Sequence, residues 1–300
     1  MSESTGEIVK SLVTNIVISC AKAFAAVITG SGAMLAETLH SFADCGNELL
    51  LLRGVHSAKR PPDKRHPLGY GRAMYFYAFI VALLLFTGGG VFSIHEGIHK
   101  MLHPEPIDDS IIAYVILGLS FLLEGWALIG NLKQIKKRRG ERSLFRYMRD
   151  TKDSDLIVVT GENAAAVLGL VLALAALLLA RETGDPRWDG AGSLAIGLVL
   201  VGVATFLARE IKSLLVGEAA DPEIVEHVRE IASAMPNIVR VMNTITLQQG
   251  PGEIIVAAKI ELKPGLDTEQ VVDTINALER DLKFRAPAVR WSFIEPDDSD

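Results

Sequence analysis

Residues 74–94 read MYFYAFIVALLLFTGGGVFSI and contain no charged side chain. Two further stretches, 163–180 and 190–208, are equally free of charge. A helix needs about 20 apolar residues to cross the hydrocarbon core of a bilayer. Only helices and closed barrels satisfy their backbone hydrogen bonds in lipid, and these runs lack the two-residue alternation of barrel strands. With 49% hydrophobic residues, the chain is predicted to be a multi-pass α-helical membrane protein.

Turn signals divide the apolar sequence into six predicted transmembrane helices. A glycine-containing turn at 28–33 separates the first two, and Pro61 and Pro62 mark the next connection. Further prolines mark later connections at 104–106 and 184–186. The predicted spans cover residues 8–29, 32–56, 73–101, 110–133, 154–181 and 189–215.

Basic residues predict how these helices are oriented. The connection 57–72 holds five Lys and Arg residues, and 133–152 holds nine. The connections near 102–109 and 182–188 are short and mostly acidic. Because basic loops stay in the cytoplasm, both long connections and both termini are predicted to be cytoplasmic. We expect the plasma (inner) membrane to be the location.

From residue 217 the composition becomes that of a soluble domain. An amphipathic helix is predicted over 222–235, opened by Asp221 as N-cap and Pro222 in the first turn. Alternating residues predict strands, and a Gly-Pro-Gly loop joins the first two. The remaining predicted elements are strands 238–248, 253–262 and 289–294 and a helix 267–282. This α-β-β-α-β order predicts a ferredoxin-like α+β domain with helices on one face of its sheet. The predicted domains are therefore 1–216, transmembrane, and 217–300, cytoplasmic.

The second predicted span carries a polar stripe. Glu37, His40, Asp44 and Asn47 recur at spacings of three, four and three residues, which places them on one face of a helix. Such groups are costly in lipid and usually functional, although a polar seam between helices is the alternative. Imidazole and carboxylate together suit Zn²⁺, and also Co²⁺, Ni²⁺ or Mn²⁺. His40 and Asp44 are the predicted metal ligands, with Glu37 and Asn47 as ligands or their supports.

This segment resembles the second membrane helix of the cation diffusion facilitator (zinc transporter) family, in which an H/D-x-x-x-D pair supplies half of the metal site. Here the pair is His40-x-x-x-Asp44. The loop 65–71, the start of the sixth span at 189–197 and the α-β-β-α-β tail are similar to the family as well. The resemblance covers nearly the whole chain. Glu162-Asn163 and 294–296 resemble the branch with an atypical fifth helix.

The resemblance implies a metal efflux transporter that works as a homodimer, with residues 217–300 as its cytoplasmic dimerisation domain. The positions that match the family's second pair are Val159 and Asn163, and a valine cannot ligate. We therefore expect His40, Asp44, Glu162 and Asn163 to form the site. The expected cargo is Zn²⁺, with Mn²⁺, Co²⁺, Ni²⁺ or Cd²⁺ as other candidates. Protons are the expected counter-ion, exchanged by alternating access, because ligands lose protons when they bind metal.

Three further places are secondary candidates. Asp63 and His66 match part of a loop metal site of the family, although Tyr70 stands where a second histidine often occurs. A solvated turn is the alternative. His95 and His99, with Glu96 between them, lie at the predicted outer end of the third span. They form either an exit or second metal site or ordinary interfacial residues. Glu124 lies within the otherwise uncharged fourth span, where it is either a proton relay or a partner for a polar helix face.

Other functions have less support from the sequence. A metal sensor or scaffold that binds zinc without transporting it is the main alternative, because the fifth helix is atypical. An enzyme is not expected, since no H-E-x-x-H or comparable motif is present. A channel is a further alternative, and its metal flux would show neither saturation nor coupling to protons. The formal net charge is −6 and no nucleic-acid-binding signature is present, so we expect no nucleic-acid partner.

Overall fold

The computed structural model describes residues 2–106, 111–141, 143–150 and 154–298. It separates into two compact units. We call the first the helical unit (1–55 and 76–212) and the second the sheet unit (56–75 and 213–300). The predicted boundary at 216/217 remains a prediction. Arg142 and Lys152 of the predicted basic loop lie outside the described residues.

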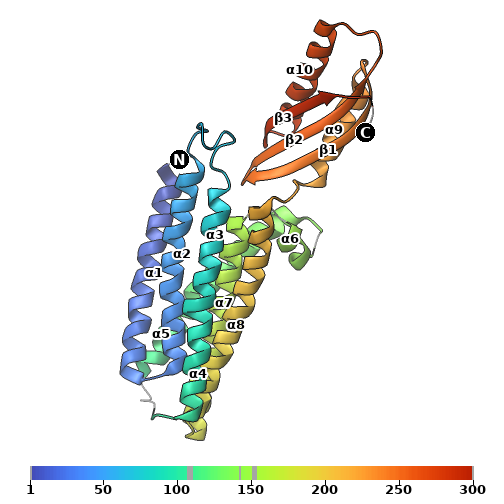
Figure 1. Ribbon diagram of the computed structural model, residues 1–300. Helices are drawn as coiled ribbons and strands as arrows, with labels where there is room; N and C mark the ends of the chain where they lie inside the picture. The colour runs from blue at the N-terminus through green and yellow to red at the C-terminus, as the bar shows by residue number, and fades with distance from the viewer. Residues whose placement is uncertain (1, 107–110, 142, 151–153, 299–300) are drawn as a thin grey trace. The chain divides into compact units, whose positions relative to one another are not determined.

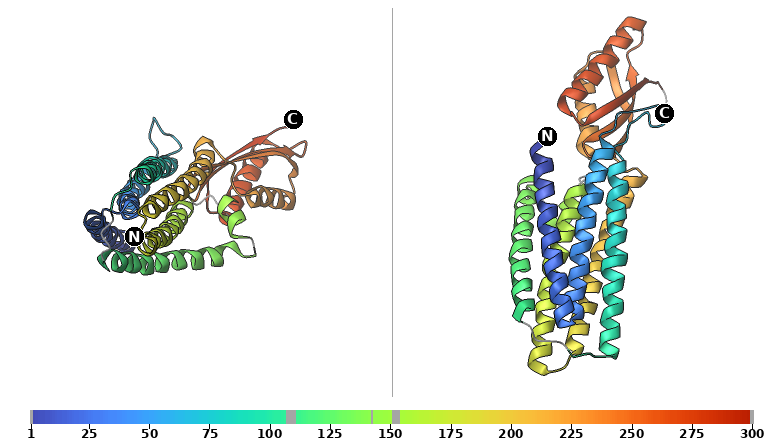
Figure 2. Two further views of the ribbon diagram at one scale, coloured as in Figure 1. Left: turned by 90° about the horizontal axis from the view of Figure 1, so that it is seen from below. Right: turned by 90° about the vertical axis from the view of Figure 1, so that its left-hand side faces the viewer.

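The helical unit is built from long helices that run side by side (Figure 1). Helix α5 packs against α1 and α7, as the view from below also shows (Figure 2). The elements that begin in this unit are α1 (Ser2–Thr29), α2 (Gly32–Ala58), η1 (Leu85–Val91), α4 (Phe92–Leu102), α5 (Ile111–Arg139), α6 (Leu144–Asp150), α7 (Ser154–Thr183) and α8 (Arg187–Val216). Helix α3 (Ala73–Leu84) leads into η1.

Four helices in the described part of the chain are long and apolar enough to cross a membrane. They are Ala73–Leu102, Ile111–Arg139, Leu156–Thr183 and Arg187–Val216, which confirms four of the predicted spans. Helices α1 and α2 form where the first two spans were predicted. Helix α1 has a shorter apolar part, Asn15–Thr29, and α2 carries the polar stripe. A count of six spans therefore remains a prediction.

The third span contains a π-helical turn, η1, between α3 and α4. Its sequence LFTGGGV has three consecutive glycines, and π-helical turns are rare and frequently found near functional sites. Beside it, α8 approaches backbone to backbone: a Cβ on Gly197 would lie 2.9 Å from the Gly90 carbonyl oxygen, and one on Gly97 would lie 2.8 Å from that of Gly190. Small residues permit such close contact between membrane helices.

The start of α2 is held by a residue of α8. The buried carboxylate of Asp189 accepts hydrogen bonds from Ser31 Oγ (2.5 Å), Gly32 N (2.5 Å) and Ala33 N (3.2 Å). The first N–H groups of a helix have no partner within it, and a carboxylate there also matches the helix dipole. Lys100 of α4 donates to the Gly30 carbonyl, and its Nζ lies 3.8 Å from Asp189 Oδ2. Asp189 therefore fixes the end of the helix that carries the stripe.

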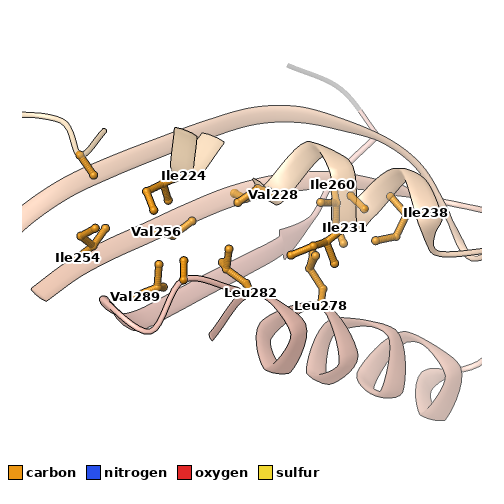
Figure 3. Close-up of a cluster of buried hydrophobic side chains, with 14 residues drawn as sticks. Ile224, Val228, Ile231, Ile238, Ile254, Val256, Ile260, Leu278, Leu282 and Val289 are labelled. Atoms are coloured by element: carbon orange, nitrogen blue, oxygen red, sulfur yellow. The ribbon is translucent and has the colours of Figure 1, made fainter. Parts of the chain in front are cut away.

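The sheet unit has the predicted α-β-β-α-β order. Its elements are α9 (Pro222–Ala234), β1 (Ile238–Gly250), β2 (Glu253–Leu262), α10 (Thr268–Arg285) and β3 (Val289–Pro296). The strands follow the order β1-β2-β3, with β1 antiparallel and β3 parallel to β2. Alternate residues of β2 face both helices, and this face forms the core shown in Figure 3. Asp221 caps α9, and Asp267 and Gln270 form a capping box at α10. A small C-terminal three-stranded domain is thus confirmed, whereas a ferredoxin-like fold stays a prediction.

The connection that follows α2 belongs to the sheet unit. Gly71 lies against the β1–β2 hairpin, where a Cβ would come 2.8 Å from the Gln249 carbonyl oxygen and 3.1 Å from Gly250 Cα. This spacing leaves no room for a side chain, so glycine is required at position 71.

Candidate metal site

The polar stripe of α2 faces the interior of the helical unit. Glu37, His40 and Asn47 are fully buried, and the side chain of Asp44 is 22% exposed. His40 Nδ1 lies 3.6 Å from Asp44 Oδ1, which is too long for a hydrogen bond but short enough for both to approach one ion. The helical spacing of four residues brings the two together, as predicted.

Helix α7 contributes the facing groups. Asn47 Nδ2 donates a hydrogen bond of 2.5 Å to Oε1 of the buried Glu162. This contact joins residues 115 positions apart and was not predicted as a pair. The hydrogen bond joins α2 to α7 at the stripe, and the role of Asn47 as a ligand or as a support for a ligand remains a prediction.

A cavity of about 90 Å³ lies between α1, α2, α5 and α7. That volume is ample for a metal ion with a water molecule, since a cavity of roughly 10–15 Å³ already holds one water. The polar residues that line it are Asn15, Ser41, Asp44, Glu48, Glu124, Glu162 and Asn163. Asp44, Glu162 and Asn163 of the predicted ligands thus share one cavity. Val159 also lines it, at the position where the family resemblance implies a ligand.

Several buried atoms of the stripe have unused hydrogen-bonding capacity. Among the described residues, both ring nitrogens of His40, Asp44 Oδ1 and Asn47 Oδ1 have no hydrogen-bond partner. Buried polar groups are normally paired, so an unpaired set is costly unless it serves a ligand. The described residues nevertheless contain no group of three His, Cys, Asp or Glu side chains close enough to hold a metal ion together. The structure places three of the four predicted ligands, Asp44, Glu162 and Asn163, around one cavity, with His40 one helical turn from Asp44.

Glu37 and Glu124 are held by Lys22, which is not among the predicted site residues. Lys22 Nζ of α1 lies 3.1 Å from Glu37 Oε2 and 2.9 Å from Glu124 Oε1. It also donates to Ser41 Oγ at 2.8 Å. The signal was present in the sequence, because a lysine within an apolar span is rare and usually paired. Glu124 therefore takes part in an ion-pair network with Lys22, and its role as a proton relay remains a prediction.

The loop candidates in the sheet unit are arranged differently. Asp63 Oδ1 accepts hydrogen bonds from the backbone N–H groups of Arg65 (2.8 Å) and His66 (2.7 Å), and Oδ2 accepts one from the Tyr70 hydroxyl (2.7 Å). The Tyr70 hydrogen bond, with help from the two backbone donors, lowers the pKa of Asp63 to about 2. The same hydrogen bond raises the pKa of Tyr70. Both oxygens of Asp63 are thus already used within the loop.

His95 and His99 lie one turn apart on α4, with ring centroids 6.5 Å apart. The structure adds His103, whose ring centroid is 5.1 Å from that of His99. His95 and His99 are exposed, so the row lies along the surface of the helical unit, without a carboxylate close enough to complete a three-residue metal group among the described residues.

The sequence of the chain is similar to those of proteins named as metal transporters. A family profile described as "Cation efflux transmembrane domain" matches residues 8–216. The chain is 31% identical over 313 residues to "Proton-coupled zinc antiporter SLC30A9, mitochondrial" of Xenopus laevis, covering 91% of this chain and 56% of that protein. It is 34% identical over 197 residues to "Metal tolerance protein C4" of Arabidopsis thaliana (65% and 43% covered). It is 21% identical over 279 residues to "Manganese efflux system protein MneP" of Bacillus subtilis (91% and 88% covered). The chain spans about half the length of the first two relatives.

Proposed function

The chain belongs to the cation efflux family, and from this membership we propose that it exports a divalent metal ion, Zn²⁺ in the first place, in exchange for protons. The observation that carries the proposal is that Asp44, Glu162 and Asn163 line one cavity, to which α2 and α7 both contribute. His40 lies one helical turn from Asp44, and neither of its ring nitrogens has a hydrogen-bond partner among the described residues. Relatives named as a zinc antiporter and a manganese efflux protein support a divalent transition metal as cargo.

We assign the four predicted residues to the transport site with distinct roles. Asp44 and Glu162 supply charged oxygens, and His40 supplies a nitrogen that favours Zn²⁺. Asn163 offers a neutral carbonyl oxygen, which makes the site more tolerant of Mn²⁺ than a site of two histidines and two carboxylates. Asn47 positions Glu162 through their hydrogen bond.

Transport in this proposal requires no covalent chemistry, so the protein is not an enzyme. An ion that enters from the cytoplasm displaces protons from its ligands. Once the cavity opens to the other side, protons return to the carboxylates and the imidazole, and the ion leaves. Six spans, cytoplasmic termini and a homodimer complete the proposal. For the location, the predicted plasma membrane competes with an internal membrane, because some relatives carry the word mitochondrial in their names.

A membrane metal sensor or scaffold is the second candidate. Two observations favour it: Val159 faces the cavity where a ligand is expected, and no three-residue metal group forms among the described residues. Such a protein would bind zinc and change conformation without moving the ion across the bilayer.

Reconstitution into liposomes tests the two candidates directly. A zinc gradient should drive saturable proton movement in the wild-type protein, and Asp44→Ala should abolish it. Asp63→Asn is the matched control, because it changes a carboxylate in the exposed loop and should leave the flux unchanged. Zinc binding that Asp44→Ala removes, without flux in the wild type, would replace the transporter by the sensor. Flux that survives Asp44→Ala would reject the assigned site.

A further inference from the structure

Lys22 is a buried cation beside the candidate metal site. Its side chain is fully buried in α1, and its ammonium group contacts three oxygens from two other helices. Glu37 and Ser41 come from α2, and Glu124 comes from α5. Ser41 and Glu124 also line the cavity that holds Asp44, Glu162 and Asn163. The ammonium group and the candidate metal site therefore share part of their surroundings.

The charges around Lys22 do not balance within the network. Two carboxylates face one ammonium group, and each carboxylate has a further oxygen, Glu37 Oε1 and Glu124 Oε2, that is buried without a hydrogen-bond partner among the described residues. Glu37 is fully buried and lies against Gly169 of α7, where a Cβ would overlap with Glu37 Oε1. Carboxylates from two helices, a hydroxyl group and unused oxygens are the components of a cation site.

We propose that Lys22 is a built-in cation that occupies a second, all-oxygen cation site formed by Glu37, Ser41 and Glu124, and so limits this part of the helical unit to one divalent metal ion. The ammonium group supplies one positive charge where a second metal ion would otherwise bind. It also keeps Glu37 and Glu124 from competing with Asp44 and Glu162 for the cargo. This inference rests on the proposed function, since it assigns a neighbour to that transport site.

The chemistry of the second site predicts which ion would replace the ammonium group. Glu37, Ser41 and Glu124 offer oxygen alone, and oxygen ligands suit Mn²⁺, whereas His40 gives the transport site its preference for Zn²⁺. Removal of Lys22 leaves two carboxylates without a counter-charge. One Mn²⁺ ion, which carries one unit of charge more than the ammonium group, would balance both.

The test counts the metal ions bound to the purified 300-residue chain by equilibrium dialysis against Mn²⁺ and, separately, Zn²⁺. The wild type should bind one ion per chain. Lys22→Gln should bind two Mn²⁺ ions, and Lys22→Gln/Glu37→Gln should return to one. Lys22→Arg, which keeps the charge, should bind one. In the Lys22→Gln protein the two Mn²⁺ ions should broaden each other's electron paramagnetic resonance signal, which a purely structural lysine would not cause.

A folded Lys22→Gln protein that binds one Mn²⁺ ion, as the wild type does, would overturn the inference and leave Lys22 as a structural ion pair. Lys22→Gln leaves two buried carboxylates without their counter-charge, so this variant is purified both without metal and in Mn²⁺. Recovery of folded protein with two ions bound supports the inference, and failure to recover it in Mn²⁺ overturns it. Two variants separate this result from the transport site. Asp44→Ala alone should bind no ion, because it removes the ion that the wild type binds. Lys22→Gln/Asp44→Ala should still bind one ion, the additional one.

Discussion

The α2 stripe and the loop after α2 carry similar ligand patterns, yet they differ in burial and in how many of their ligand atoms are already hydrogen-bonded. In the stripe, His40 and Asp44 are separated by 3.6 Å and have buried atoms without hydrogen-bond partners among the described residues. In the loop, Asp63 is exposed and both of its oxygens accept hydrogen bonds from Arg65, His66 and Tyr70.

The difference shows that residue types at ligand spacing are not enough to make a metal site. A metal ion must compete with whatever the ligand atoms already bind, and an internal hydrogen bond that satisfies a carboxylate removes part of the gain. Burial without partners has the reverse effect, because a bound ion relieves the cost of desolvated polar atoms. We therefore expect metal in the helical unit and a hydrogen-bonded turn in the loop.

The largest expected effect comes from the charged ligand of the stripe. Asp44→Asn keeps the size of the side chain but removes the negative charge, so zinc affinity should fall by about 100-fold or more, since even support residues of a metal site are worth 10–100-fold. Asp63→Asn should change affinity by less than about threefold on the same scale. Isothermal titration calorimetry of both variants measures the contrast. Equal losses in the two proteins would show that loop and stripe bind metal alike.

A smaller loss is expected when the support of Glu162 is removed. Asn47→Ala deletes the 2.5 Å hydrogen bond to Glu162 but no assigned ligand, and zinc affinity should fall by roughly 10–100-fold. Asn47→Asp is the informative companion, because it places a like charge beside Glu162 and should not restore the affinity. Calorimetry again provides the measurement. An unchanged affinity in Asn47→Ala would mean that Glu162 does not need to be held for binding.

The loop after α2 allows the opposite experiment, in which a substitution creates a zinc site. Tyr70→His removes the hydroxyl group that occupies Asp63 Oδ2 and adds an imidazole near His66, whose ring centroid lies 4.2 Å from that of Tyr70. Two imidazoles and a carboxylate are a familiar zinc ligand set. We expect one additional zinc ion per chain, bound on the order of tenfold more weakly than in the stripe, because the loop is exposed to water. Tyr70→Phe is the matched control and should bind no additional ion in equilibrium dialysis.

Local patterns predicted much of the fold. Four spans and the α-β-β-α-β order follow from apolar runs, alternation and caps such as Asp221, all of which act within a few residues. Contacts between distant residues were not predictable in this way. Asp189 reaches Gly32 across 157 positions, and Asn47 reaches Glu162 across 115. Helical periodicity places each side chain on a face but does not say which helix that face meets.

The candidate site was predictable to a similar extent. The spacing of His40 and Asp44 indicated a shared site, and Glu162 and Asn163 came from the family resemblance. Lys22 was open to prediction, because a lysine in an apolar span requires a partner, yet its partners Glu37 and Glu124 lie on two other helices. The role of Tyr70 could not be read from its spacing, because spacing identifies a ligand position but not whether the neighbouring carboxylate is already satisfied.

The smallest expected effect concerns protonation of the loop. Because the pKa of Asp63 is lowered to about 2 from 3.8, its ionised form stabilises the turn at all pH values above about 3.8, and this contribution is lost as pH falls through about 2. Tyr70→Phe removes the hydrogen bond that contributes most to the shift, so the pKa of Asp63 should rise toward 3.8 and the turn should lose this contribution at a higher pH. Carboxyl ¹³C chemical shifts of labelled aspartate, assigned with Asp63→Asn, measure the titration. A pKa that stays near 2 in Tyr70→Phe would mean that the backbone N–H groups of Arg65 and His66 alone satisfy Asp63. Asp63 Oδ2 would then not need the Tyr70 hydroxyl group as a hydrogen-bond partner, and the loop would differ from the α2 stripe in burial alone.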